Sequence, residues 1–145
     1  MRLTNYTDYS LRVLIYLALK KEDELSTIKE IADSYQISKN HLMKITHELG
    51  LMGYIDTIRG RNGGIRLLMD PKDINIGELV LKTEEDFHLV ECFHNNKEGA
   101  NRCIISPACK LKHILHESMV AFIQVLKGYT LADLIENKTD LIKFL

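Results

Sequence analysis

The segment from Ser26 to Leu68 constrains the fold of this chain more than any other part of it. We expect Ser26 to cap a short helix whose apolar residues recur at helical spacing. Its predicted buried face is Ile28, Ile31, Ala32 and Tyr35. After a short connection, Ser38 is expected to cap a second helix. The inward residues of that helix are Leu42, Ile45 and Leu49. Two short helices joined by so few residues predict a helix-turn-helix.

A β-hairpin is predicted directly after the second helix. The segments Tyr54 to Ile58 and Gly64 to Leu68 have the composition of strands. Between them, Asn62-Gly63 favours the left-handed backbone angles of a tight hairpin turn. A helix-turn-helix followed by a hairpin is the order of elements in a winged helix. The expected fold is therefore mainly α with a small β-hairpin.

Further helices are predicted on both sides of this unit. The first covers about residues 5–20, and Asn75 with Glu78 is typical of a capping box that starts another. Ser106 is a favourable N-cap and Pro107 suits the first position of a long helix reaching about residue 127. Thr130 is expected to cap a last short helix.

The long helix carries a narrow apolar seam. Its members, three and four residues apart in alternation, are Ala108, Leu111, Leu115, Ser118, Phe122 and Val125. A central core helix of a monomer is one interpretation, and a dimerisation helix packed on its twin is another. We favour a homodimer because the remaining elements look too few to cover the apolar surface of this helix. The predicted dimer contacts are Leu111, Leu115, Phe122 and Val125.

Positive charge is concentrated on two segments of a nearly neutral chain. With 19 Lys plus Arg against 20 Asp plus Glu, a histone-like polycation is excluded, whereas a local basic footprint is not. The second helix of a helix-turn-helix enters the major groove, and arginines on a glycine-rich hairpin reach phosphates or a minor groove. We therefore expect double-stranded DNA as partner. The predicted DNA-binding residues are Ser38, Lys39, Asn40, His41, Lys44, Arg59, Arg61, Asn62 and Arg66.

Several protein classes are excluded by simple features of the sequence. The longest purely apolar run, Val13 to Leu19, is far shorter than the roughly 20 residues of a membrane span. The first residues lack an apolar signal core, so we expect a cytoplasmic protein without membrane contact. Serine, histidine and aspartate residues form no recognisable nucleophile motif, so we expect no enzyme.

Three cysteines lie close together in a chain with no others. An odd number cannot form a closed disulfide framework, and ten residues separate Cys92 from Cys103 and five separate Cys103 from Cys109. Zinc ligand pairs typically lie two to four residues apart, so thiolates around a helix start suit an iron–sulfur cluster better. Cys109 is expected in the first turn of the long helix, where the helix dipole favours an anionic group. Buried apolar thiols without a metal are the plainer interpretation.

A cluster of this kind usually has four protein ligands, so a fourth donor is needed. His113 follows Cys109 by one helical turn, His94 follows Cys92 by two residues, and Asp8 is distant in sequence. The residues alone do not decide which of these three is the fourth ligand. Asp8 also has the spacing of an ion-pair partner of Arg12.

This combination resembles the bacterial winged-helix regulators that carry an iron–sulfur cluster, of which IscR is one branch. The chain looks most like the NsrR branch, the nitric-oxide-sensing repressors. The similarity rests on residues 3–12, Ile37-Ser38-Lys39-Asn40-His41-Leu42, the hairpin residues 59–65, Glu91-Cys92-Phe93 and residues 103–109. The last of these, Cys-Ile-Ile-Ser-Pro-Ala-Cys, is the most specific.

The resemblance implies a homodimer, a [4Fe-4S] cluster and repression of genes for nitric oxide detoxification. It places the three cysteines on the cluster ligands and Asp8 on the fourth, donated across the dimer by the partner subunit. The IscR branch has a histidine instead, and His113 sits one residue later than that pattern. The first cysteine gap is also longer than in many relatives.

Three functions follow as alternatives. The leading one is a repressor whose operator binding is controlled by the cluster and nitric oxide, with oxygen or cluster supply as other signals. The second is a cluster-free regulator that senses oxidants through its thiols. The third, an iron–sulfur carrier, is disfavoured by the basic hairpin. The predicted organisation is a winged helix-turn-helix at 1–70, a linker helix and cluster-binding loop at 71–106, and a dimerisation helix with a tail at 107–145.

Overall fold

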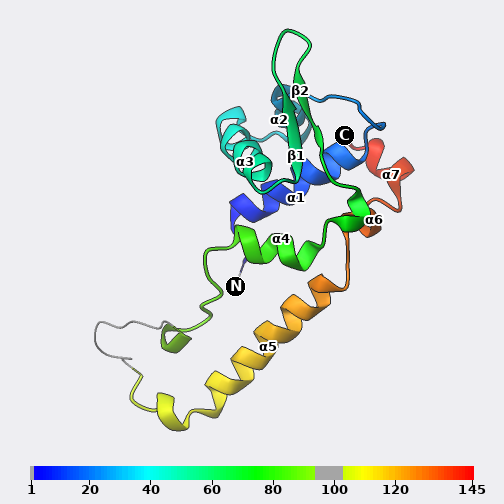
Figure 1. Cartoon of the computed structure of the whole chain (residues 1–145). Coiled ribbons are helices and arrows are strands. Elements are labelled where there is room, and N and C mark those ends of the chain that lie inside the picture. The colour runs from blue at the N-terminus through cyan, green and yellow to red at the C-terminus, as the bar shows by residue number, and fades with distance from the viewer. Residues whose placement is uncertain (1, 94–102) are drawn as a thin grey trace.

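The helix α1 (Asn5–Ala18) lies at the centre of the amino-terminal body (Figure 1). The computed structural model describes residues 2–93 and 103–145. Thr4 caps α1 by accepting from the backbone N–H of Thr7. One face of α1 contributes the buried side chains of Val13, Leu14 and Leu17, and the helix contacts α3, β2, α4 and α6. The helix ends at Ala18, slightly earlier than expected.

The helix-turn-helix is confirmed as α2 (Ile28–Tyr35) and α3 (Lys39–Leu51). The predicted cap of α2 is wrong by one residue, because Thr27 forms the capping box with Glu30. Those hydrogen bonds from the Thr27 backbone and hydroxyl hold the pKa of Glu30 below its usual value. Ser38 occupies the N-cap position of α3, although its side chain makes no capping bond.

The wing is confirmed as an antiparallel hairpin of β1 (Ile55–Ile58) and β2 (Gly64–Leu67). The expected five-residue connection between the strands is found, but the expected left-handed angle at Asn62-Gly63 is wrong. Ile58 pairs with Gly64, so five residues form the loop, and Gly60 takes the left-handed angle with φ of 117°. Gly63 is needed for space rather than for its backbone angle, because a Cβ there would lie 2.1 Å from the Ile58 carbonyl oxygen.

The linker begins with a short 3-10 turn, η1 (Pro71–Asp73), and continues as α4 (Ile76–Thr83). Asn75 caps α4 by accepting from the Glu78 N–H. The second half of the predicted capping box is wrong, because the Glu78 carboxylate pairs instead with Lys127 at 2.7 Å. Gly77 allows this close approach, since a Cβ there would lie 2.4 Å from the Lys127 side chain.

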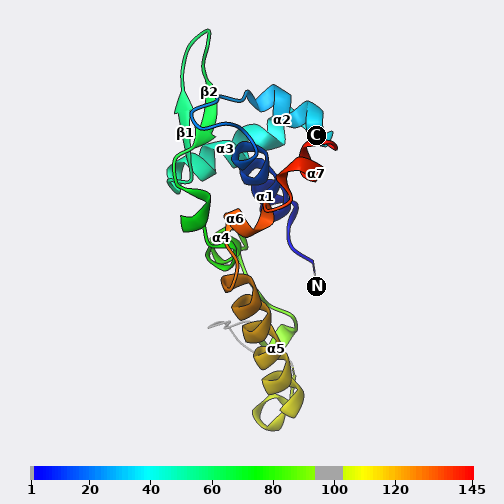
Figure 2. The same cartoon turned by 90° about the vertical axis from the view of Figure 1, so that its right-hand side faces the viewer.

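The long helix α5 (Lys110–Lys127) projects away from the body (Figure 2). The predicted start is wrong: Ser106–Ala108 is a separate 3-10 turn, η3, and Cys109 is the N-cap rather than a first-turn residue. The end at Lys127 is as expected. Two short helices follow, α6 (Leu131–Leu134) behind the predicted Thr130 cap, and α7 (Lys138–Ile142).

Two apolar clusters hold these elements. The larger unites α1, α2, α3, the hairpin, α4 and α6 around fully buried residues such as Leu14, Leu42 and Leu79. The smaller joins α4 to α5 through Val80, Met119 and Ile123. The expected fold class, mainly α with a small hairpin, is therefore confirmed. Across the described residues, no helix combines the length and apolar character needed to cross a membrane.

Candidate nucleic-acid interface and metal centre

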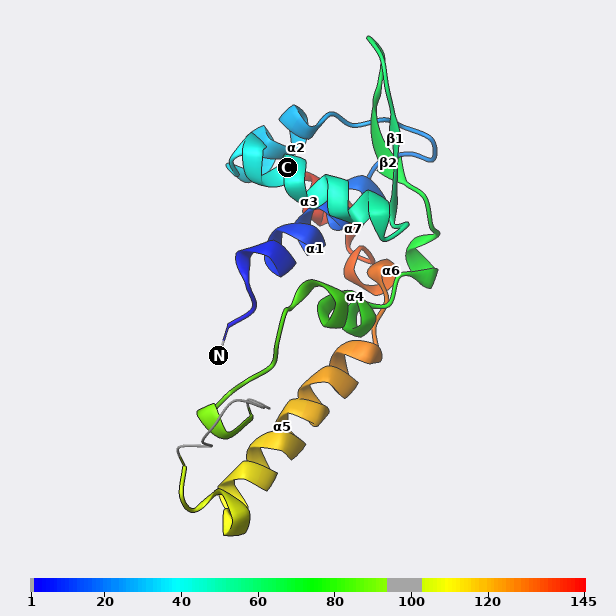
Figure 3. The ribbon, with the colours of Figure 1, turned by 60° about the vertical axis from the view of Figure 1, so that its left-hand side comes forward.

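The predicted reading residues of α3 form one exposed surface. Leu42, Ile45 and Leu49 are buried against α1 and α2, which turns the opposite side of α3 outward. All five predicted residues at its start are exposed: Ser38, Lys39, Asn40, His41 and Lys44. The wing stands beside α3, and α3 contacts β1 (Figure 3). The structure thus presents polar and basic side chains of two elements together.

The four predicted wing residues separate into two groups. Arg59, Arg61 and Asn62 are exposed in the hairpin loop, and neither arginine makes an ion pair among the described residues. Arg66 is half-buried on β2 and is bonded to two carboxylates, Asp56 at 3.4 Å and Asp23. Sequence reasoning missed this pairing, because Asp23 is 43 residues away in the chain.

The three cysteines lie at the far end of the molecule from the wing. Cys92 is on a 3-10 turn, η2 (Glu91–Phe93), Cys103 precedes η3, and Cys109 caps α5. All three are free and half-buried. The Phe93 ring meets the His116 ring of α5 edge-on, with centroids 6.4 Å apart, which draws the segment of Cys92 towards α5.

The donor chemistry of this region fits an iron–sulfur cluster. The three free thiols lie on η2, before η3 and at the N-cap of the 18-residue helix α5, and the Cys109 side chain makes no capping bond to the N–H groups of that helix. Such a helix end favours an anionic, thiolate-bound group. Within the described part of one chain, however, no three His, Cys, Asp or Glu side chains converge on a common point.

Asp8 lies on a different element from the cysteines of its own chain. It lies in the first turn of α1 and accepts from Arg12 twice, at 2.9 and 3.1 Å, while its side chain is 43% exposed. The Arg12 guanidinium lies over the rings of Tyr9 and Tyr35, 5.8 and 5.9 Å from their centroids. Burial raises the pKa of Tyr35 to about 12, so its phenol stays neutral beside Arg12. The predicted alternative, an ion pair of Asp8 with Arg12, is thus present.

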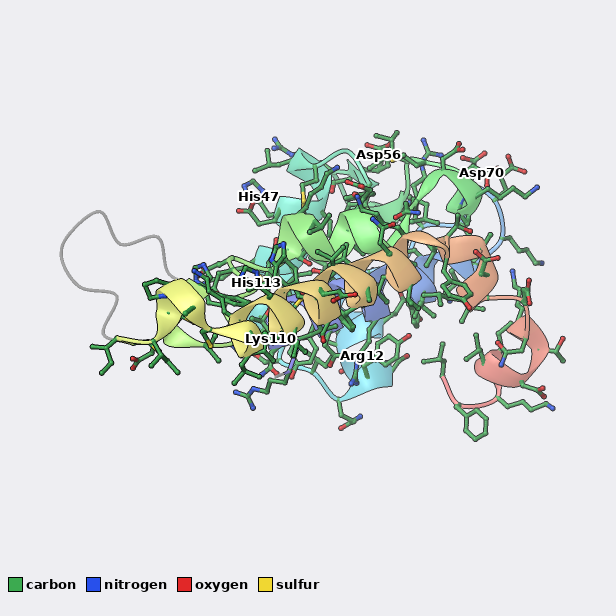
Figure 4. All side chains as sticks on the ribbon, turned by 90° about the horizontal axis from the view of Figure 1, so that it is seen from below. Arg12, His47, Asp56, Asp70, Lys110 and His113 are labelled. Atoms are coloured by element: carbon green, nitrogen blue, oxygen red, sulfur yellow. The ribbon has the colours of Figure 1, made fainter. Side chains whose placement is uncertain are left out.

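The histidine candidates differ in their positions. His113 is exposed near the start of α5, one turn from Lys110 (Figure 4). Arg12, the partner of Asp8, lies on α1 instead. His94 lies outside the described residues, as does most of the loop between Cys92 and Cys103.

One buried and one exposed hydrogen bond, both missed by sequence reasoning, join the start of α1 to the end of α4. The Thr7 hydroxyl donates to Thr83 at 2.9 Å, and the Thr4 N–H donates to Glu84 at 2.8 Å. Threonines in amphipathic helices look like ordinary surface residues, so the sequence holds no signal for this contact.

The predicted seam residues of α5 lie on two different faces of the helix. Leu115 and Phe122 are half-buried, and Phe122 packs against the cluster of α4 and α5. Leu111 and Val125 are 59% and 63% exposed. The exposed face continues at the same alternating spacing and consists of Leu111, Ile114, Ser118, Ala121 and Val125.

Comparison with known proteins places the chain in a family. The model of the Rrf2 family, described as an iron-dependent transcriptional regulator, matches residues 3–137. The HTH-type transcriptional regulator NsrR of Bacillus subtilis (strain 168) is 63% identical over 145 residues, covering all of this chain and 97% of the relative. NsrR of Oceanobacillus iheyensis is 54% identical over 142 residues, covering 98% and 95%.

Solved structures share the fold at low identity. A regulator from Listeria innocua superimposes with a TM-score of 0.73 and 24% identity, covering 94% of this chain and 87% of that one. For T. potens IscR the TM-score is 0.69, with 21% identity and coverage of 94% and 88%. For the oxidised form of Staphylococcus aureus CymR it is 0.72, with 23% identity and coverage of 94% and 97%. The chain therefore belongs to the Rrf2 family and is a DNA-binding transcriptional regulator rather than an enzyme.

Proposed function

We propose that this regulator is a homodimeric repressor whose operator binding requires a [4Fe-4S] cluster and is abolished by nitric oxide. The observation that carries the proposal is the set of three free thiols on η2, before η3 and at the N-cap of α5. The name of the relatives compared above, NsrR, and the iron-dependent description of the family support it.

Cys92, Cys103 and Cys109 would hold the cluster, and Asp8 of the partner subunit would complete the ligand set. When bound, the cluster supplies iron with which nitric oxide reacts. A carboxylate is the harder and weaker ligand for such iron, so the Asp8 corner would be the most open to attack.

The environment of Asp8 supports a link to the reading helix. Iron ligation would compete with the two bonds that the Asp8 carboxylate accepts from Arg12, so it would weaken the hold of Asp8 on the Arg12 guanidinium. Arg12 lies over Tyr9 and Tyr35, and the Tyr9 ring is 6.4 Å from that of His41 on α3. A change at Asp8 would therefore reach α2 and α3 through adjacent side chains.

The cofactor is tested by absorbance and iron content of anaerobically purified protein. The proposal predicts a broad iron–sulfur band and about four irons per chain. Colourless, iron-free protein that still binds its operator would instead identify a thiol-based regulator.

The fourth ligand is tested by Asp8→Ala beside His113→Ala. We expect Asp8→Ala to retain a cluster that decays faster or responds differently to nitric oxide, because three thiolates remain. His113→Ala should behave nearly as the unmodified protein. The measurement is the decay of cluster absorbance under nitric oxide. Loss of the cluster from His113→Ala alone would reassign the ligand.

The DNA contacts are tested by Asn40→Ala and Arg61→Ala. Loss of a bidentate base contact at Asn40 should cost about 1–3 kcal/mol on the preferred sequence and relax sequence preference. Arg61→Ala should weaken binding to all sequences and reduce the salt dependence by about one phosphate contact per subunit. Binding to a selected duplex and a scrambled duplex, each at several salt concentrations, separates the two effects. Unchanged binding by both variants would contradict the assigned surface.

A further inference from the structure

The wing is attached to the loop between α1 and α2 by its backbone. The Ser26 N–H donates to the Ile65 carbonyl at 3.0 Å, and the Ile65 N–H donates to the Ser26 carbonyl at 2.8 Å. Gly64 makes this possible, because a Cβ there would lie 2.8 Å from the Ser26 oxygen. The loop thus pairs with the edge of β2 for one residue, which fixes the base of the wing.

A side-chain bridge extends this attachment. Asp56 and Arg66 are directly opposite in the hairpin register, and their carboxylate and guanidinium lie 3.4 Å apart. The other terminal nitrogen of Arg66 bonds Asp23 in the loop. The Asp56 contact lies within the wing, so the Asp23 contact is the one that ties the wing side chains to the body.

The charges around Arg66 differ from those at the tip of the wing. Two carboxylates flank one guanidinium, so the three groups together carry a negative charge at neutral pH. A phosphate would be repelled by Asp23 and Asp56. Arg59 and Arg61 have no such acidic partners within the described residues.

We propose that Asp23, Arg66 and Asp56 form a clamp that sets the direction of the wing, and that Arg66 is a positioning residue rather than a DNA contact. The clamp acts through Arg59 and Arg61, and so rests on the proposed contact of the wing tip with DNA. It replaces the sequence-based assignment of Arg66 to the DNA-binding residues.

The direction in which one substitution changes the DNA affinity tests the clamp. Asp23 has φ of 62°, a left-handed angle that asparagine also tolerates, so Asp23→Asn removes the charge without adding backbone strain. Removal of a negative charge near DNA favours binding by electrostatics alone. The clamp predicts the opposite, an affinity reduced between roughly two- and fivefold, the range of an exposed ion pair.

Glu22→Gln is the matched control. Glu22 is exposed, precedes Asp23 in the same loop and makes no ion pair in the part of the chain that the structure describes. The control should bind as well as the unmodified protein or slightly better. Affinities are measured by fluorescence anisotropy with anaerobically purified protein and a duplex selected from a randomised pool. Equal effects of the two variants would overturn the clamp.

A second comparison tests whether the clamp acts through the wing tip. Asp23→Asn should lose its effect in the Arg59→Ala/Arg61→Ala background, whereas a general loss of stability would persist there and lower the Tm. The Arg66→Gln variant and the double variant Arg66→Gln/Asp23→Asn should bind the duplex with equal affinity. A full effect of Asp23→Asn without the tip arginines would overturn the positioning role. If Arg59→Ala/Arg61→Ala by itself changed nothing, the proposed wing contact would fail, and the clamp with it.

Discussion

Replacement of any one of Cys92, Cys103 or Cys109 by alanine should lower operator affinity by roughly two to three orders of magnitude, towards non-specific binding. Each variant removes a thiolate that the proposed cluster would need. The three positions should give the same loss, although they lie on η2, before η3 and at the N-cap of α5. The measurement is operator binding of anaerobically purified protein beside its iron content.

The matched control is Lys110→Ala, at the first residue of α5 and exposed. It should retain both iron and operator affinity. Circular dichroism separates cluster loss from unfolding. The cysteine variants should stay folded, because the half-buried thiols belong to neither apolar cluster. Cysteine variants that keep operator affinity after losing iron would contradict the proposal.

Ile114→Asp should convert the proposed dimer to a soluble monomer. The exposed face of α5 has a spacing that suits packing against a second copy. Two unpaired carboxylates in such an interface each cost several kcal/mol, so the dimer dissociation constant should rise at least roughly hundredfold. Sedimentation equilibrium measures it. The monomer should stay folded, because Ile114 is 54% exposed in the single chain.

Val120→Asp is the control for this variant. Val120 is also aliphatic, is 46% exposed and belongs to the same helix, but faces away from the stripe that contains Ile114. It should remain dimeric. Equal dissociation of both variants, or a monomeric unmodified protein at micromolar concentration, would contradict α5 as the dimer contact.

Element types followed from the sequence because periodicity and capping are local. The apolar spacing of α1, α2, α3 and α5 predicted helices that the structure contains. The cap of α2 was also within reach, since Thr27 and Glu30 have the capping-box spacing whereas Ser26 does not. Asn62-Gly63 misled, because a five-residue loop places its left-handed angle at Gly60.

Contacts distant in the chain could not be predicted in this way. Nothing local indicates that Asp23 meets Arg66, or that Thr7 donates to Thr83. The apolar seam of α5 was visible in the sequence. Which of its residues α4 covers and which stay exposed depends on how α4 and α5 pack, including the close approach of Gly77 to Lys127. The three thiols were identified by spacing, and so was the ion pair of Asp8 with Arg12, whereas the contact of Arg12 with Tyr35 of α2 required the fold.

The central claim is that cluster integrity controls operator binding, and one anaerobic titration tests it most directly. Nitric oxide is added stepwise to holo-protein bound to its fluorescent operator duplex, while cluster absorbance and anisotropy are recorded from the same cuvette. We expect the duplex to be released in proportion to the loss of cluster absorbance, with no release from a parallel sample without nitric oxide. Anisotropy that stays constant after all cluster absorbance is lost would contradict the account.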